Sequence, residues 1–249
     1  MKIFVKILKV ESGKRESLEF LLPHRAFLGP HSESLLASKP YDKIFVVGLN
    51  RCGTTSFFKV FKQLGLSAYH GENQSIWNYV HTFDSFCDFG VDYEGFKKIQ
   101  ALSYRSCFIL NTRPALDWVV STLMQRLMLS ENSFKITEEA IKLLLSKRRT
   151  YFKQVLNRSL KTNANICLVN ITRKGWGQFV SSWLGFRSIS AEKINVTSCR
   201  EEFKRFRLSR QKPAIVSTVS TVFNQIKSSE EELFFPGSEG LVEQFPRYL

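Results

Sequence analysis

The sequence lacks most of the features that mark specialised classes of protein. No run of about 18 apolar residues occurs, so we expect no transmembrane helix. Lys2, Lys6 and Lys9 interrupt the apolar residues at the start of the chain, so this segment does not resemble a signal peptide. The five cysteines are scattered without a CxxC pair, which argues against both a zinc knuckle and a disulfide framework. We therefore expect a cytoplasmic protein with reduced cysteines and no bound metal.

Acidic residues are also scarce. The chain has 36 Lys and Arg against 22 Asp and Glu, a net charge of +14. Such a surface attracts anions, including nucleic acids, anionic membranes, anionic glycans and phosphorylated nucleotides. No RNP, KH or zinc-finger pattern supports recognition of nucleic acid, so we expect no nucleic-acid partner.

Continuous apolar segments alternate with amphipathic stretches along the chain. Three segments are typical of strands buried on both faces of a parallel sheet: 43–48, 107–111 and 166–171. Helices are predicted at 54–64, 114–129, 137–160 and 176–184. This alternation predicts an α/β fold with a mostly parallel central sheet flanked by helices.

At 249 residues, of which 43% are hydrophobic, the chain suits one packed domain. We expect an N-terminal extension over 1–42, a nucleotide-binding core over 43–187 and a C-terminal segment over 188–249. The alternation of Ile3, Val5 and Ile7 predicts a strand in the extension.

The loop between the first core strand and its helix, residues 48–55 (GLNRCGTT), has the spacing of a Walker A phosphate loop. Thr54 replaces the lysine that reaches the β- and γ-phosphates of a triphosphate, and Arg51 places a cation inside the loop instead. Glycines and successive N–H groups at a helix N-terminus suit an anion. Because glycine also serves any strand-to-helix turn, the loop alone indicates an anion site without naming the ligand.

A second candidate site follows the strand at 107–111. Arg113 stands at its carboxyl end, where α/β sheets bind ligands. Ser121 lies about two helical turns further on, facing the same side. A guanidinium and a hydroxyl there can hold a second phosphate. Together with the loop, they indicate a nucleotide with phosphates at two separate places.

Both segments resemble motifs of sulfotransferases that use PAPS, 3′-phosphoadenosine 5′-phosphosulfate. KIFVVGLNRCGTTSFF is similar to their 5′-phosphosulfate loop, and NTRPALDWVVS to their 3′-phosphate motif, with Trp118 between its Arg and Ser. The resemblance covers 43–125, with a weaker fit over 166–185. In having Arg at the cationic position of the loop, the chain resembles tyrosylprotein sulfotransferases and many bacterial relatives. The resemblance implies a P-loop-like fold that binds PAPS and PAP.

By that resemblance, Arg113 and Ser121 hold the 3′ phosphate. The 5′ sulfate-phosphate is held by loop residues, namely Arg51, Cys52, Gly53, Thr54, Thr55 and Ser56. Arg51 is also expected to stabilise the bridging oxygen as PAP departs.

Sulfuryl transfer further needs a general base near the acceptor. Residues 66–73 (LSAYHGEN) end a predicted second strand and offer His70 and Glu72. Some bacterial relatives resemble this chain in having Tyr-His there, whereas Golgi-type families have a catalytic Glu at a similar distance from the loop. Asp88 in FCDFG is a third candidate. The choice among the three stays open at this point.

Two other basic segments bear on the nucleotide. Residues 173–175 (RKG) share their letters with a tripeptide that closes over the nucleotide in cytosolic sulfotransferases. They precede SSWLG, whereas the family's tripeptide follows the corresponding segment, so we interpret the match as coincidence. The tract 200–212 is the better-placed candidate for contacts with the nucleotide or an acidic acceptor.

The sequence thus predicts an enzyme that moves a sulfuryl group from PAPS to a hydroxyl, with a carbohydrate as the candidate acceptor. One alternative is a nucleotide kinase or NTPase with a degenerate P-loop. The missing lysine and the Arg113–Ser121 pair argue against it. Another alternative is a non-catalytic protein that binds PAP or nucleic acid, which the net charge would suit.

Overall fold

A computed structural model describes seven segments of the chain: 26–27, 36–71, 76–88, 92–102, 104–129, 136–187 and 212–226. The strand expected around Ile3–Ile7 lies outside these residues, and so does the basic tract 200–212 apart from Lys212.

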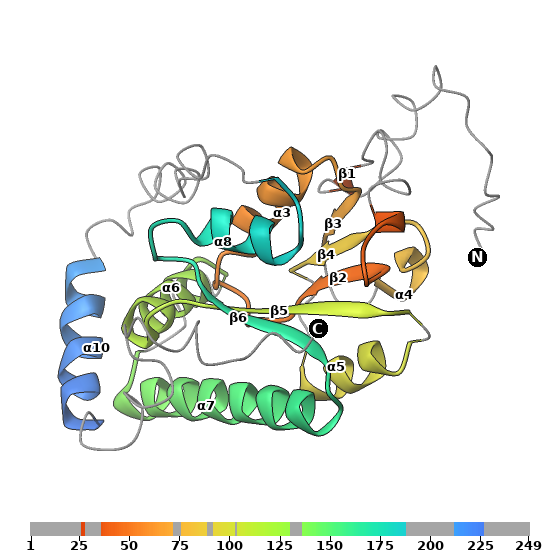
Figure 1. The fold of residues 1–249 in the computed structure, drawn as a ribbon. Coiled ribbons are helices and arrows are strands. Elements are labelled where there is room, and N and C mark those ends of the chain that lie inside the picture. Colours follow the sequence, from red (N-terminus) through yellow and green to blue (C-terminus); the bar gives the residue numbers. More distant parts are fainter. Residues whose placement is uncertain are drawn as a thin grey trace, which may run out of the picture.

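A six-stranded sheet forms the centre of the described structure (Figure 1). In spatial order its strands are β1 (Ala26–Phe27), β3 (Ala68–His70), β4 (Ser85–Cys87), β2 (Lys43–Val46), β5 (Ser106–Thr112) and β6 (Asn165–Asn170). Five strands pair in parallel, and the short β1 runs antiparallel to β3. The three predicted core strands are confirmed, as is the α/β class with a mostly parallel sheet.

The strand β2 lies in the middle of the sheet, between β4 and β5. The chain first builds β3 and β4 on one side of β2 and then crosses to build β5 and β6 on the other. Ligands of open parallel sheets bind outside the carboxyl ends of the strands, where the winding direction reverses. The loop that follows β2 lies at this position.

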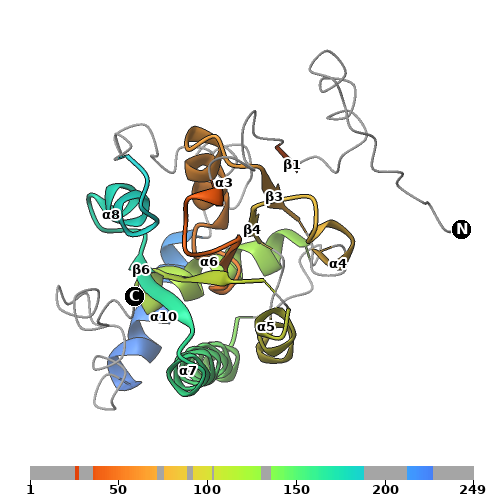
Figure 2. The ribbon, with the colours of Figure 1, turned by 45° about the vertical axis from the view of Figure 1, so that its right-hand side comes forward.

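Helices cover both faces of the sheet. They are α3 (Thr54–Gln63), α4 (Ile76–Tyr79), α5 (Tyr93–Gln100), α6 (Ala115–Leu129), α7 (Glu138–Lys161), α8 (Trp176–Trp183) and α10 (Lys212–Ile226). Figure 1 and Figure 2 show α3 and α8 on one face, α5 and α7 on the other, and α10 beside α6. The four predicted helices are confirmed, whereas the sequence patterns did not indicate α4, α5, α10 or β4.

Each central strand is buried on both faces because successive side chains point in opposite directions. Ile44 and Val46 of β2 belong to the core under α3, which contains Phe57. Phe45 lies on the other face, in the core that contains Phe152 of α7. Since neither face meets water, the strand is continuously apolar rather than alternating.

Capping residues account for two of the helix boundaries. Gly65 ends α3 with a φ of 77°, and its N–H donates to the carbonyl of Lys62 at 3.0 Å. At the start of α7, the hydroxyl of Thr137 accepts from the N–H of Ala140 at 3.2 Å. None of the described helices combines the length and the apolar character needed to cross a bilayer.

Candidate anion-binding site

The candidate residues that the structure describes gather at the carboxyl edge of the sheet. The loop 48–53 follows β2, His70 ends β3, Asp88 follows β4 and Arg113 follows β5. Since these four strands are parallel, their ends meet on one side of the sheet. Glu72, one of the three candidate bases, lies outside the described residues.

Asn111 of β5 holds the loop in place. This fully buried side chain accepts from the N–H of Gly48 at 2.8 Å through Oδ1 and donates to the carbonyl of Cys52 at 2.7 Å through Nδ2. A Cβ at Gly48 would lie 2.1 Å from the carbonyl oxygen and from Oδ1 of Asn111. On the α6 side, Nε1 of Trp118 donates to the carbonyl of Asn50 at 2.9 Å. The loop is therefore fixed by side chains at both ends.

Asn111 was not predicted as a site residue from the sequence. Its only signal was a polar residue closing an otherwise apolar strand, which is common at strand ends. Tyr151 was not predicted as a site residue either. Its buried hydroxyl donates to the carbonyl of Val47, just before the loop, at 2.5 Å. Burial raises the pKa of Tyr151, so this hydroxyl stays protonated and keeps its role as a donor.

Two residues in the left-handed region shape the loop, Arg51 with a φ of 70° and Gly53 with a φ of 84°. Gly53 precedes the first turn of α3. A Cβ there would lie 2.3 Å from Cδ1 of Ile171, the residue after β6. Only glycine therefore combines this backbone conformation with this close approach.

The N–H groups of Gly53, Thr54 and Thr55 donate to no other group in the described segments. The next residue, Ser56, donates its N–H to the carbonyl of Gly53 at 2.9 Å. Ser56 was expected to contribute to the anion site, but its amide is used within the helix. Three N–H groups at the positive end of the α3 dipole form a cradle for an anion.

Arg113 and Ser121 both contact Arg51. The Nε of Arg51 donates to the hydroxyl of Ser121 at 3.1 Å, and Nη1 of Arg113 donates to the carbonyl of Arg51 at 3.2 Å. The residues predicted to hold the two phosphates thus lie beside one another. The Nε of Arg113 is buried without a hydrogen-bond partner, and no carboxylate of the described segments pairs with this guanidinium.

A third arginine lies behind these two. Arg148 of α7 is 3% exposed, and its Nη2 donates to the hydroxyl of Thr112 at 3.1 Å and to the carbonyl of Arg113 at 2.9 Å. Its guanidinium lies 5.9 Å from the centre of the Trp118 ring and 5.2 Å from that of Phe152. Arg148 was not predicted from the sequence. Its signal was its position in the apolar stripe of α7, four residues before Phe152.

The thiol of Cys52 is fully buried at the base of the loop. Burial raises its pKa to about 12, although the charges of Arg148 and Arg113 act in the opposite direction. Its N–H donates to the carbonyl of Leu49 at 3.1 Å. Cys52 therefore carries a neutral thiol that packs as a small apolar group. Burial also raises the pKa of the three other described cysteines, which are free and buried as well: Cys87, Cys107 and Cys167.

His70 and Asp88 meet on the other side of the α3 N-terminus. The Nε2 of His70 lies 3.3 Å from the hydroxyl oxygen of Thr55 and 3.6 Å from Oδ2 of Asp88. The side chain of His70 is 1% exposed and that of Asp88 is 27% exposed. The structure thus links two of the three candidate bases to the loop through Thr55.

The tripeptide at residues 173–175 forms the turn that begins α8. Gly175 has a φ of 83° and precedes the first helical residue, and the N–H of Trp176 donates to the carbonyl of Arg173 at 3.4 Å. This local role accounts for the glycine without a ligand. Across the described segments, no group of three or more His, Cys, Asp and Glu side chains is placed to hold a metal ion.

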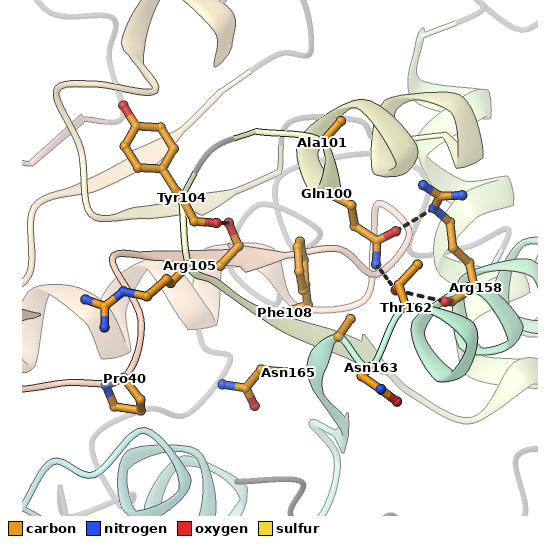
Figure 3. Close-up of a pocket in the computed structure, with 12 residues that line it drawn as sticks. Pro40, Gln100, Ala101, Tyr104, Arg105, Phe108, Arg158, Thr162, Asn163 and Asn165 are labelled. Atoms are coloured by element: carbon orange, nitrogen blue, oxygen red, sulfur yellow. Dashed lines mark hydrogen bonds between the residues drawn. The ribbon is translucent and has the colours of Figure 1, made fainter.

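A cavity of about 340 Å³ lies at the opposite edge of the sheet, around the starts of β5 and β6 (Figure 3). Its two arginines have partners among the described residues. Arg105 pairs with Asp42 at 2.6 Å, and Nε of Arg158 donates to Oε1 of Gln100. None of the candidate site residues lines this cavity.

Comparisons with models of known protein families, with curated proteins and with solved structures returned no match.

Proposed function

We propose that this chain is a PAPS-dependent sulfotransferase, which moves a sulfuryl group to an acceptor hydroxyl and releases PAP. The observation that carries the proposal is the buried Nε of Arg113, which has no acceptor and lies beside a loop with three unused N–H groups. A buried donor without a partner costs about 1–3 kcal/mol. An anion bound there would recover that free energy.

The donors form two groups, which fits a ligand with two anionic ends. The N–H groups of Gly53, Thr54 and Thr55 suit the 5′ phosphosulfate. Arg113 and the hydroxyl of Ser121 suit the 3′ phosphate. Arg51 lies between the two groups, where its charge can stabilise the phosphate oxygen that is released when the sulfuryl group leaves.

Thr54 bears on the choice between PAPS and a triphosphate. It occupies the position of the Walker lysine, and the residue is 5% exposed. A nucleotide kinase would need another cation to reach the outer phosphates. We therefore favour PAPS over ATP, in a P-loop-like fold. For the acceptor we retain a hydroxyl of a carbohydrate, because a net charge of +14 suits anionic glycans.

Ligand-induced thermal stabilisation of the full chain tests this function. We expect PAP without Mg²⁺ to raise the melting temperature, because a ligand that binds only the folded state stabilises it in proportion to RT ln(1 + [L]/Kd). AMP should stabilise far less, because it lacks the 3′ phosphate that Arg113 would bind. ATP with Mg²⁺ should have no effect.

The same panel separates the alternatives. Stabilisation by ATP with Mg²⁺ but not by PAP would support the kinase or NTPase and exclude our proposal. Equal stabilisation by PAP and AMP would show that the 3′ phosphate is not recognised. A short single-stranded oligonucleotide serves as the control for general attraction of anions. If it stabilises the chain as well as PAP does, the protein binds nucleic acid instead.

A further inference from the structure

The contact between His70 and its two neighbours determines what its imidazole can do. Thr55 and Asp88 both face the same ring nitrogen, Nε2, at 3.3 Å and 3.6 Å. An ionised carboxylate can only accept a hydrogen bond. The proton of a neutral His70 is therefore most favourable on Nε2, directed at the two oxygen atoms. A ring nitrogen that already carries a proton cannot take one from an acceptor hydroxyl.

The burial of His70 points the same way. Its side chain is 1% exposed, and the ring of Phe58 packs against it edge-on with the ring centres 5.5 Å apart. A general base must come within about 2.6–3.2 Å of the proton that it removes. With 1% of the side chain exposed, neither ring nitrogen is open to an acceptor.

Asp88 has the opposite properties. It follows β4, the strand adjacent to β2, and its side chain is 27% exposed. Its φ of 54° lies in the left-handed region, which Asp and Asn adopt more readily than most residues. Strained backbone conformations of this kind concentrate at functional sites. Because its side chain is partly exposed and that of His70 is not, the Asp88 carboxylate is the part of this pair that an acceptor can touch.

We propose that Asp88 is the catalytic base for the acceptor and that His70 is a positioning residue, which holds the Asp88 carboxylate and the Thr55 hydroxyl in register. This inference rests on the proposed function. The acceptor oxygen forms a bond to sulfur while the bond from sulfur to the bridging phosphate oxygen breaks. The electron pair of that bond leaves with PAP, and the acceptor proton passes to Asp88 and then to water.

Two substitutions distinguish the base from the positioning residue. Asp88→Asn removes the basic carboxylate, and Asn tolerates the left-handed conformation of Asp88. His70→Gln keeps an N–H donor at nearly the position of Nε2 but cannot act as a base. The activity to follow is PAP release from PAPS in the presence of mixed monosaccharides, so that either a sugar hydroxyl or water can accept. The affinity for PAP is measured alongside by calorimetry.

We expect Asp88→Asn to lower kcat by about 10²–10⁴-fold, the usual contribution of a general base. The Kd for PAP should change less than about twofold, because Asp88 is not among the residues proposed to hold the nucleotide. His70→Gln should retain kcat within about tenfold of the wild type. Glu94→Gln, which removes an exposed carboxylate on α5, is the matched control and should leave both quantities unchanged.

The opposite pattern overturns the assignment: a large loss of kcat in His70→Gln with Asp88→Asn still active makes His70 the base. Equal rates in Asp88→Asn and wild type also exclude Asp88. If His70→Gln does not fold, the rate of Asp88→Asn still decides. A wild type that binds PAP but releases none from PAPS excludes a working base at Asp88. A wild type that does not bind PAP refutes the proposed function itself.

Discussion

The two edges of the sheet both carry arginines, but in opposite surroundings. At the amino edge, Arg105 pairs with Asp42, and Arg158 donates to Gln100. At the carboxyl edge, Arg113 contacts the backbone of Arg51 and has a buried Nε without an acceptor. The guanidinium groups of the amino edge are thus satisfied by the protein, and that of Arg113 only in part.

Helix polarity sharpens this difference. Arg158 belongs to the last turn of α7, where a positive charge is favoured by the negative end of the helix dipole. Arg51 and Arg113 lie beside the start of α3, where the dipole disfavours positive charge. At the amino edge, contacts within the fold account for the position of Arg158. At the carboxyl edge, the proposed anionic ligand would supply the reason that the fold does not.

The largest effect on stability and on PAP binding is expected when a methyl group is added at Gly48, at the carboxyl edge. In Gly48→Ala the new Cβ would lie 2.1 Å from two oxygen atoms of Asn111, so the loop must move away from β5. Overpacking of this kind costs about 1–3 kcal/mol, and we place this variant at the upper end because backbone is involved. Urea denaturation should show that loss, and calorimetry should show no measurable binding of PAP.

Gly185→Ala is the matched control for this variant. Gly185 also has a positive φ, of 68°, but the nearest atom to its added Cβ is the flexible end of Lys39 at 3.3 Å. We expect a cost of about 1 kcal/mol from backbone strain and an unchanged affinity for PAP. A Gly48→Ala protein that binds PAP normally would show that the loop is not the ligand site.

The next effect compares the two edges directly. Arg113→Ala should weaken PAP binding by about 10- to 100-fold, which corresponds to one hydrogen bond to a charged group. Its stability should change little, because the substitution also removes a buried donor that has no partner. Arg105→Ala removes the same charge from the amino edge and should leave the Kd for PAP unchanged. Equal losses in both variants would indicate general attraction of anions by the basic surface.

Much of the fold could be predicted because its elements are local patterns. The continuous apolar strands and the spaced apolar residues of α3, α6, α7 and α8 depend on neighbours in sequence. By contrast, β4 has three residues and α5 has eight. Elements this short give too few repeats for a period to stand out, and pairing with β2 and β3 decides the conformation of β4.

The positions of Arg51, Gly53 and Arg113 in the fold were predictable because all three lie in segments that directly connect a predicted strand to a predicted helix. Asn111 and Arg148 were missed because their partners are distant in sequence: Asn111 bonds to Gly48, and Arg148 to Thr112. A buried polar side chain in an apolar stripe is recognisable only once the facing element is known. His70 was a candidate from its motif, but the burial and the contacts that favour a positioning role over that of a base depend on residues distant in sequence.

A smaller effect tests the support behind the carboxyl edge. Arg148→Lys keeps the positive charge, but a lysine ammonium does not reproduce the position and planar shape of the guanidinium whose Nη2 bonds both Thr112 and the carbonyl of Arg113. We expect a loss of about 1–2 kcal/mol in the free energy of unfolding and an increase of about 3- to 10-fold in the Kd for PAP. Arg158→Lys at the amino edge is the control and should leave the Kd unchanged. If Arg148→Lys affects stability alone, Arg148 supports the core and not the ligand site.

The smallest effect is a pH-dependent change in melting temperature, and it concerns the ion pair of Asp42 and Arg105 at the amino edge. The Arg105 hydrogen bond holds the pKa of Asp42 below its ordinary value. A carboxyl whose pKa is depressed by folding adds stability above its unfolded pKa of about 3.9. That contribution is lost as the pH falls through the lower, folded value. Asp42→Asn should thus lower the melting temperature at pH 7 by at most about 3 °C, since the pair is exposed.

Below about pH 4 this difference between the variant and the wild type should shrink, because the wild-type carboxyl is then protonated as well. Melting curves at pH 7 and pH 3 measure both values. PAP binding at pH 7 should be the same in the two proteins, since Asp42 acts at the edge away from the loop. A change in PAP affinity on replacing Asp42 would show that the two edges are coupled through β5, which Arg105 and Arg113 flank. The amino edge would then contribute to ligand binding as well as to stability.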